Sequence, residues 1–146
     1  MSVQLFTKVL PKGYRGELEI ELQTIAARHG LAPRIISVFE ERTQTIVQME
    51  DIGAPCLAEI YGENPQNIPQ IIWQRIHTIL ELLFEHEGIE YVDITPYNFL
   101  QRNNGGIVCI DYGDAYYTTS GKDDPPTNWF LAEFLDGNFT WNPDFK

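Results

Sequence analysis

The sequence predicts a small α+β domain, and three observations support this prediction. The chain has 146 residues, of which 43% are hydrophobic and 21% are charged, as in an ordinary globular domain. Stretches that alternate apolar and polar residues, typical of strands, occur in the same chain as stretches with apolar residues at helical spacing. Clusters of glycine, proline and asparagine separate them. At this length folding buries about 68–70% of the unfolded chain's surface, enough for a single core.

The N-terminal third predicts an antiparallel sheet with one helix. Residues 3–10 alternate in character and predict a strand in which Lys8 shares a face with large apolar side chains. Residues 15–29 predict an amphipathic helix with glutamates at its start and Arg28 near its end. Residues 34–39 and 45–50 predict two strands of a hairpin joined by a polar turn.

The middle of the chain predicts an irregular connection followed by the strongest helix. Glycines and prolines interrupt residues 51–67, so we expect a connecting segment there. The helix that follows extends to Gly88, whose position suits a left-handed stop. One face of this helix carries apolar residues, namely Ile68, Ile72, Ile76, Ile79, Leu80 and Leu83.

A second hairpin is predicted around the turn at residues 103–106. Its strands cover residues 98–102 and 107–111, and the turn sequence Asn-Asn-Gly-Gly tolerates positive φ angles. A register centred on this turn places Asn98 directly opposite Asp111, with Cα atoms about 4.5–5.5 Å apart. The aromatic residues from Trp129 onward predict a short helix and a tail that cover the core, or alternatively a partner-binding surface.

This hairpin is expected to carry chemistry. Carboxylate and amide oxygens are the ligands that Mg²⁺ takes together with substrate phosphates, so Asn98 and Asp111 are candidate metal ligands. Asp93, in the loop before the hairpin, would remain available to orient or deprotonate a hydroxyl group.

These motifs, in this order, resemble the protein-kinase-like superfamily, including minimal serine/threonine protein-kinase-like domains and the choline and aminoglycoside kinases. The segment from Asp93 to Asn98 is similar to the family's catalytic loop, and Asp111-Tyr112-Gly113 is similar to its metal motif. The resemblance implies a minimal bilobal kinase-like fold. Residues 1–50 would form a truncated lobe with a small antiparallel sheet and one helix, and residues 51–146 a reduced, mostly helical lobe carrying the catalytic hairpin.

The resemblance also implies site residues and cofactors. Lys8 is similar to the strand lysine that holds nucleotide phosphates, and Glu19 to the helix glutamate that pairs with it, with Glu21 as a second candidate. Met49 to Ile52 resembles the hinge between lobes, where main-chain groups of Glu50 and Ile52 would meet adenine. The implied cofactors are ATP and Mg²⁺. The implied catalytic residues are Asp93, Lys8 and Glu19, the nucleotide-binding residues are Lys8, Glu50, Ile52, Asn98 and Asp111, and the metal ligands are Asn98 and Asp111.

Departures from the family pattern shape the expected function. Tyr91 replaces the histidine that precedes the catalytic aspartate, and no glycine-rich loop precedes Lys8. We therefore expect a kinase that transfers phosphate to a serine or threonine of a protein, with a partner chain or second copy completing the truncated lobe. The alternatives are a pseudokinase that serves as a nucleotide-binding module, and a small-molecule hydroxyl kinase.

Charge and hydropathy limit the possible partners. Ten basic residues against 21 acidic ones give a net charge of −11, which would repel a phosphate backbone, so we expect no nucleic-acid binding. No apolar run reaches the roughly 18 residues of a membrane span. We expect a soluble, cytoplasmic protein without membrane association.

Overall fold

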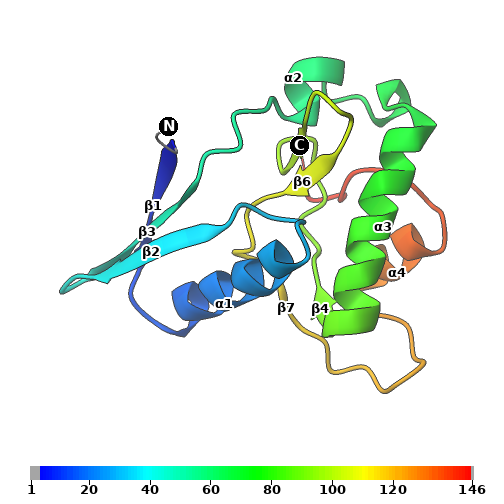
Figure 1. The fold of residues 1–146 in the computed structure, drawn as a ribbon. Coiled ribbons are helices and arrows are strands. Elements are labelled where there is room, and N and C mark those ends of the chain that lie inside the picture. The colour runs from blue at the N-terminus through cyan, green and yellow to red at the C-terminus, as the bar shows by residue number, and fades with distance from the viewer. Residues whose placement is uncertain (1–3, 146) are drawn as a thin grey trace.

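A computed structural model describes residues 4–145 and shows a sheet with one helix beside a mostly helical part (Figure 1). The three strands of the sheet are antiparallel and lie in the order β1-β3-β2. They comprise β1 (Leu5–Pro11), β2 (Ile35–Glu40) and β3 (Gln44–Glu50). The three predicted strands and their hairpin are therefore confirmed, except that Val3, expected to begin the first strand, lies outside the described residues.

Helix α1 (Tyr14–Arg28) lies between the sheet and the helical part, and its two sides bury different apolar side chains. Its Leu18, Leu22 and Ala26 belong to the main core. On another side, Ile20 packs against a small cluster below the sheet, formed by Leu10, Val47 and Met49. The helix is consequently held from both sides, which fixes the side chains it presents to the space between the two parts.

Helix α3 (Gln70–Glu87) forms the centre of the helical part. Five of the six apolar residues predicted to share one face lie on this helix and are buried, whereas Ile68, also buried, precedes the helix, which begins at Gln70. The helix ends at Gly88, which adopts the left-handed conformation with φ of 65°. In the part of the chain that the structure describes, no helix is both long and apolar enough to cross a membrane.

The segment predicted as an irregular connection contains two short helical elements. Helix α2 (Leu57–Tyr61) and the 3₁₀ turn η1 (Pro65–Asn67) both lie within residues 51–67. The helix begins with a capping arrangement in which the Glu59 carboxylate accepts from the Cys56 backbone N–H, and it buries Leu57 completely. One turn of helix is too short to show a helical period in the sequence, so the prediction missed it.

The second hairpin is present, but its predicted register is wrong by one residue. Strands β5 (Phe99–Gln101) and β6 (Ile107–Cys109) pair so that Phe99 faces Cys109. The turn closes through Arg102, whose N–H donates to Gly106 O, and Gly105 has a φ of 87°. This is a three-residue loop with a bulge rather than a symmetric four-residue turn. Asn98 therefore lies opposite Ile110, not Asp111.

Most of the C-terminal aromatic residues cover the core, in agreement with the first of the two predictions, whereas Trp129 is 66% exposed. Helix α4 (Trp129–Leu135) begins at Asn128, whose side chain accepts from the Leu131 N–H. Phe130, Phe134 and Trp141 are buried, and the Trp73 ring on α3 packs against both Phe134 and Trp141. These rings thus extend the main core.

Two further strands were not predicted. β4 (Ile89–Glu90) follows α3 directly and pairs with β7 (Tyr116–Tyr117). Each has two residues, too few to establish an alternating pattern. Glu90 has no exposed surface, and its carboxylate accepts hydrogen bonds from the Tyr116 and Thr118 hydroxyls, from the Thr127 N–H and hydroxyl, and from the Asn128 N–H. This buried carboxylate ties residues 116–128 to the strand that leads into the Asp93 loop.

Candidate active site

A cavity of about 560 Å³ separates the sheet from the β5–β6 hairpin, and all the candidate residues except Asp93 and Glu19 line it. Its apolar lining includes Phe6, Met49, Leu100 and Ile110, and its polar lining includes Lys8, Asn98 and Asp111. A cavity of this size, with apolar walls and a few convergent polar groups, suits a small-molecule ligand. The predicted hinge residues Glu50 and Ile52 also line it.

Lys8 forms an ion pair with Glu19 and not with Glu21. The Lys8 Nζ lies 2.5 Å from Glu19 Oε2, and Glu19 is buried with only 8% of its surface exposed. Glu21 lies on a different side of α1, where its carboxylate accepts from the Tyr117 hydroxyl at 2.5 Å. That hydrogen bond raises the pKa of Tyr117 to about 12. Of the two glutamates considered from the sequence, Glu19 is the one that contacts the lysine.

Asp111 is the second anionic neighbour of Lys8. Its Oδ1 lies 3.6 Å from Lys8 Nζ. Burial by itself would lower the pKa of Lys8, but the hydrogen bond to Glu19 and the negative charges of Asp111 and Glu19 outweigh it, so the pKa is raised. The ammonium group is therefore held in its charged form at the wall of the cavity.

The backbone at Asp111 turns sharply away from the strand. Asp111 has a φ of 63°, which is uncommon for a residue other than glycine and typical of functional sites. Gly113 N–H donates to Asp111 Oδ1 at 3.2 Å. A Cβ atom on Gly113 would lie 3.1 Å from Glu19 Oε1 and 3.2 Å from Asp111 Oδ1, so a larger residue would require these carboxylates to shift by a few tenths of an ångström. The Arg15 guanidinium donates to Gly113 O and links this turn to α1.

Asn98, which lines the cavity, forms a hydrogen-bonded pair with Asp93. The Asn98 Nδ2 donates to the Asp93 backbone oxygen at 2.9 Å and to its Oδ2 at 3.0 Å. Both amide hydrogens are used in this way, which leaves Oδ1 as the Asn98 atom able to bind a cation. Burial raises the pKa of Asp93, the hydrogen bond from Asn98 lowers it, and the nearby carboxylates of Asp111 and Asp114 raise it, with a net increase.

Asn98 and Asp111 face the same cavity although the register that predicted their proximity was wrong. The positive φ of Asp111 brings its side chain back toward Lys8 after β6 has ended. Among residues 4–145, no group of three histidine, cysteine or acidic side chains is arranged to hold a metal ion. A cation bound here would take one amide and one carboxylate oxygen from the chain and the rest from water or phosphate, as Mg²⁺ does.

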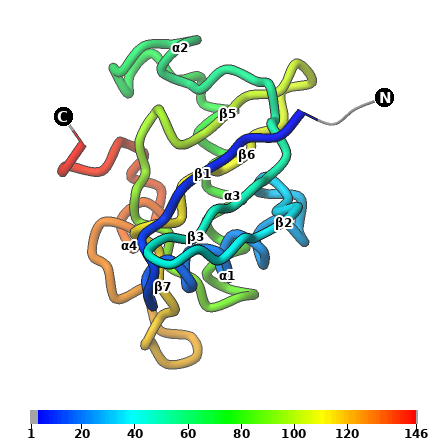
Figure 2. The backbone as a smooth tube through the Cα atoms, turned by 90° about the vertical axis from the view of Figure 1, so that its left-hand side faces the viewer, coloured from blue at the N-terminus to red at the C-terminus, as the bar shows by residue number. Residues whose placement is uncertain are grey.

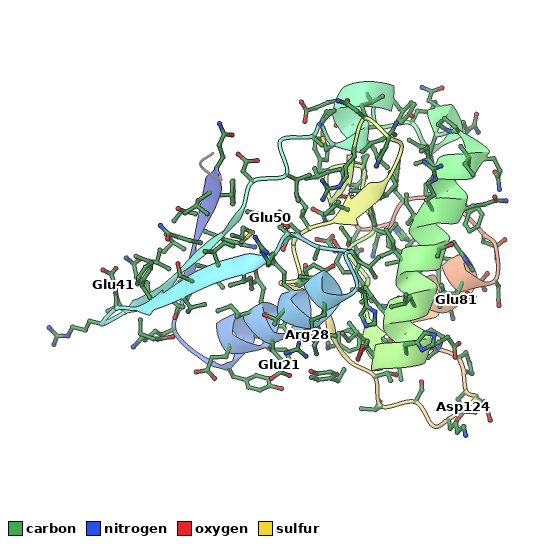
Figure 3. All side chains as sticks on the ribbon, in the orientation of Figure 1. Glu21, Arg28, Glu41, Glu50, Glu81 and Asp124 are labelled. Atoms are coloured by element: carbon green, nitrogen blue, oxygen red, sulfur yellow. The ribbon has the colours of Figure 1, made fainter. Side chains whose placement is uncertain are left out.

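The hinge segment is ordered by the neighbouring strand. The Glu50 N–H donates to Arg34 O, and the Glu50 carboxylate accepts from the Arg34 N–H at 2.9 Å. The main-chain group of Glu50 that remains for a ligand is therefore its carbonyl. Figure 3 shows Glu50 at the end of β3 nearest the helical part, where the chain crosses between the two.

Tyr91 stands at the position where the family pattern has a histidine, and it has a structural role here. Its hydroxyl donates to Ile110 O at 2.6 Å, and its ring is buried against Tyr112 and Phe99. Tyr91 therefore links the segment that leads to Asp93 with the backbone immediately before Asp111. Sequence reasoning missed this contact, as it missed those of Arg15 and Glu90, because each joins segments that are far apart in the sequence.

Replacement of Tyr112 by Phe is expected to leave the protein as stable or to make it more stable by up to about 1 kcal/mol. The Tyr112 hydroxyl is fully buried and is the one buried side-chain polar atom among the described residues without a hydrogen-bond partner, and such a group carries an uncompensated desolvation cost. Urea unfolding of both proteins measures the difference. The Tyr91→Phe variant is the matched control and should lose stability, because its hydroxyl is bonded to Ile110 O. A large loss in Tyr112→Phe would contradict the prediction.

The fold is that of the protein kinases. The structure matches the kinase PK-1 of Cydia pomonella granulovirus with a TM-score of 0.66 and 14% sequence identity. The match covers 85% of this chain and 48% of the granulovirus kinase, so the chain spans about half the length of that protein. No protein-family model and no curated protein sequence matches the chain. The predicted kinase-like α+β fold is confirmed, with a sheet lobe that includes α1 and a reduced, mostly helical lobe.

Proposed function

We propose that the chain binds ATP with Mg²⁺ in the cavity between its lobes and transfers the terminal phosphoryl group to a hydroxyl acceptor. The observation that carries the proposal is the convergence of separate segments on one cavity. Lys8 from β1, Asn98 from the loop before β5 and Asp111 from the turn after β6 line this cavity. Glu19 of α1 and Asp93 are joined to it through their contacts with Lys8 and Asn98.

Each group has a role that its surroundings support. Lys8, kept charged and oriented by Glu19, would neutralise nucleotide phosphates. The Asn98 Oδ1 and the Asp111 carboxylate would hold Mg²⁺, which when bound offsets the negative charge of the phosphates. The Glu50 carbonyl and the Ile52 main chain would contact the base between apolar side chains such as Met49.

Asp93 would position the acceptor hydroxyl and accept its proton. Its carboxylate is held by the Asn98 amide, and its raised pKa makes it a better proton acceptor than an ordinary aspartate. The protein contributes position and charge rather than covalent chemistry, as in other phosphoryl transfers. The proposed acceptor is a serine or threonine of a protein. The support for this acceptor is the similarity in fold to a viral kinase.

Thermal unfolding with nucleotide tests this proposal. At one hundred times the dissociation constant, Mg-ATP should stabilise the fold by about 2.7 kcal/mol, which raises the midpoint by roughly 5–10 °C for a chain of this size. Chelation of Mg²⁺ should remove most of the shift. Transfer of labelled phosphate to a serine/threonine acceptor mixture separates a kinase from a nucleotide-binding module without catalysis.

Two lysine variants on the same strand region provide the control. Lys8→Met should lose the nucleotide-dependent shift, because the ammonium group facing the cavity is gone. Lys12→Met should keep it, since Lys12 pairs with Glu40 at 3.3 Å and does not line the cavity. The absence of any shift at millimolar Mg-ATP in the unmodified protein would contradict the proposal.

A further inference from the structure

Strand β1 presents an open hydrogen-bonding edge. Asp51 N–H donates to Gln4 O and Lys12 N–H donates to Thr43 O, so the even-numbered residues of this strand direct their backbone groups toward β3. The N–H and C=O groups of Leu5, Thr7 and Val9 therefore point to the other side. Among residues 4–145, β1 is an edge strand and no strand pairs with that side.

Strand β1 carries only two of the features that usually prevent strand addition, an inward-pointing charge at Lys8 and a proline at its end. Leu5, Phe6 and Val9 are 44%, 53% and 54% exposed, and β1 contains no acidic residue. Its lysine, Lys8, is turned inward and bound by Glu19. Proline occurs only at the last position of the strand. Exposed edges are normally shortened, charged or covered, so an apolar edge of seven residues is suited to pairing with another strand.

A second copy of the chain is disfavoured at this edge by charge. Symmetric antiparallel pairing of two β1 strands would relate the copies by a twofold axis perpendicular to the sheet. The cavity lies between β1 and the β5–β6 hairpin, since Thr7 and Val9 line it together with Leu100 and Ile110, and Figure 2 shows β1 in front of β6. Two copies that each carry a net charge of −11 would repel each other along this edge. A single extended segment of opposite charge avoids this repulsion.

The net charge of the chain indicates whether the added segment would be basic or acidic. The chain carries a net charge of −11. Glu50 and Asp51 line the cavity next to the start of β1, while Glu41 lies at the tip of the β2–β3 hairpin (Figure 3). A basic segment would be attracted to this surface, whereas an acidic one would be repelled.

We infer that an extended, basic segment of another protein adds to β1 as a fourth strand and closes the open side of the cavity. Its backbone pairs with Leu5, Thr7 and Val9. This surface lies outside the groups proposed to handle phosphate, and strand addition does not require phosphoryl transfer, so the two proposals fail or succeed separately.

Amide hydrogen exchange with a synthetic peptide of alternating valine and arginine tests the inference on the full chain. With the peptide in excess, the amides of Leu5, Thr7 and Val9 should exchange at least about tenfold more slowly. The amides of Phe6, Lys8 and Leu10 already face β3 and should change little, which makes them an internal control. No protection at Leu5, Thr7 and Val9, or equal protection throughout β1, would overturn the inference.

Peptide variants identify the binding mode without altering the protein. N-methylation of the peptide amides that face β1 should abolish binding, and methylation of the alternate set should leave it intact. A valine–glutamate peptide should bind at least about tenfold more weakly at low salt, with the difference shrinking as salt is added. Equal binding of both methylated peptides, or equal binding of the acidic peptide, would overturn the inference. So would a concentration-dependent doubling of mass without peptide, since that would identify a second copy as the occupant.

Discussion

Replacement of Asp111 by asparagine should lower kcat/KM for phosphoryl transfer by about 10²–10³-fold or more, the loss typical of removing one preorganised electrostatic contact. The substitution keeps the size of the side chain but removes the charge that would bind Mg²⁺ and that lies 3.6 Å from Lys8 Nζ. Asparagine tolerates the φ of 63° at this position, so the turn should form as before. The variant should also lose the dependence of nucleotide affinity on Mg²⁺.

Steady-state kinetics and nucleotide titrations with and without Mg²⁺ measure this effect. Asp123→Asn is the matched control, because it removes an equal charge at an exposed residue with a similar φ of 71° that does not line the cavity. Thermal unfolding of both variants without nucleotide checks that the fold is retained. Transfer activity in Asp111→Asn equal to that of the unmodified protein would refute the assignment of this residue as a metal ligand.

Replacement of Glu90 by alanine should lower the free energy of unfolding by about 3–5 kcal/mol, a loss typical of breaking a buried hydrogen-bond network. The substitution leaves the Thr127 and Asn128 N–H groups and the hydroxyls of Tyr116, Thr118 and Thr127 without their common acceptor. Urea unfolding at neutral pH measures the loss. Glu81→Ala on α3 is the control and should change little, since the Glu81 side chain is 56% exposed (Figure 3).

The contribution of Glu90 should also depend on pH. Burial would raise the pKa of Glu90, but the hydrogen bonds from Thr118, Thr127 and Asn128 outweigh it and lower the pKa. A lowered folded-state pKa means that the stabilisation is fully present above the pKa of the unfolded chain, near 4.5, and is lost as pH falls through the folded-state value. The Glu90→Gln variant should therefore show a flatter decline of stability in acid. An equally steep decline would contradict this.

Local periodicity was sufficient to predict most of the fold. The alternation in β3 and the helical spacing in α3 are strong because each of these elements buries one face over several residues. The register of the β5–β6 hairpin was not predictable in the same way. Arg102 and Gly106 pair around a loop of three residues, and a sequence of two asparagines and two glycines fits that loop as well as a symmetric turn.

Within the candidate site, the sequence predicted the residues that belong to the family motifs and missed the others. The order of Lys8, Asp93, Asn98 and Asp111 suggested one cavity through a family resemblance, and all four lie around it or beside it. The choice of Glu19 over Glu21 needed the rotation of α1, which the sheet and core set together. Glu90 was not foreseen, because a buried carboxylate depends on donors that come from distant segments.

Helix α1 has a consequence for how the site would respond to a disturbance. The same helix contacts the strand lysine through Glu19, the glycine of the metal motif through Arg15, and the segment beyond it through Glu21 and Tyr117. A change in the position of this helix should therefore affect the proposed phosphate-binding and cation-binding groups together.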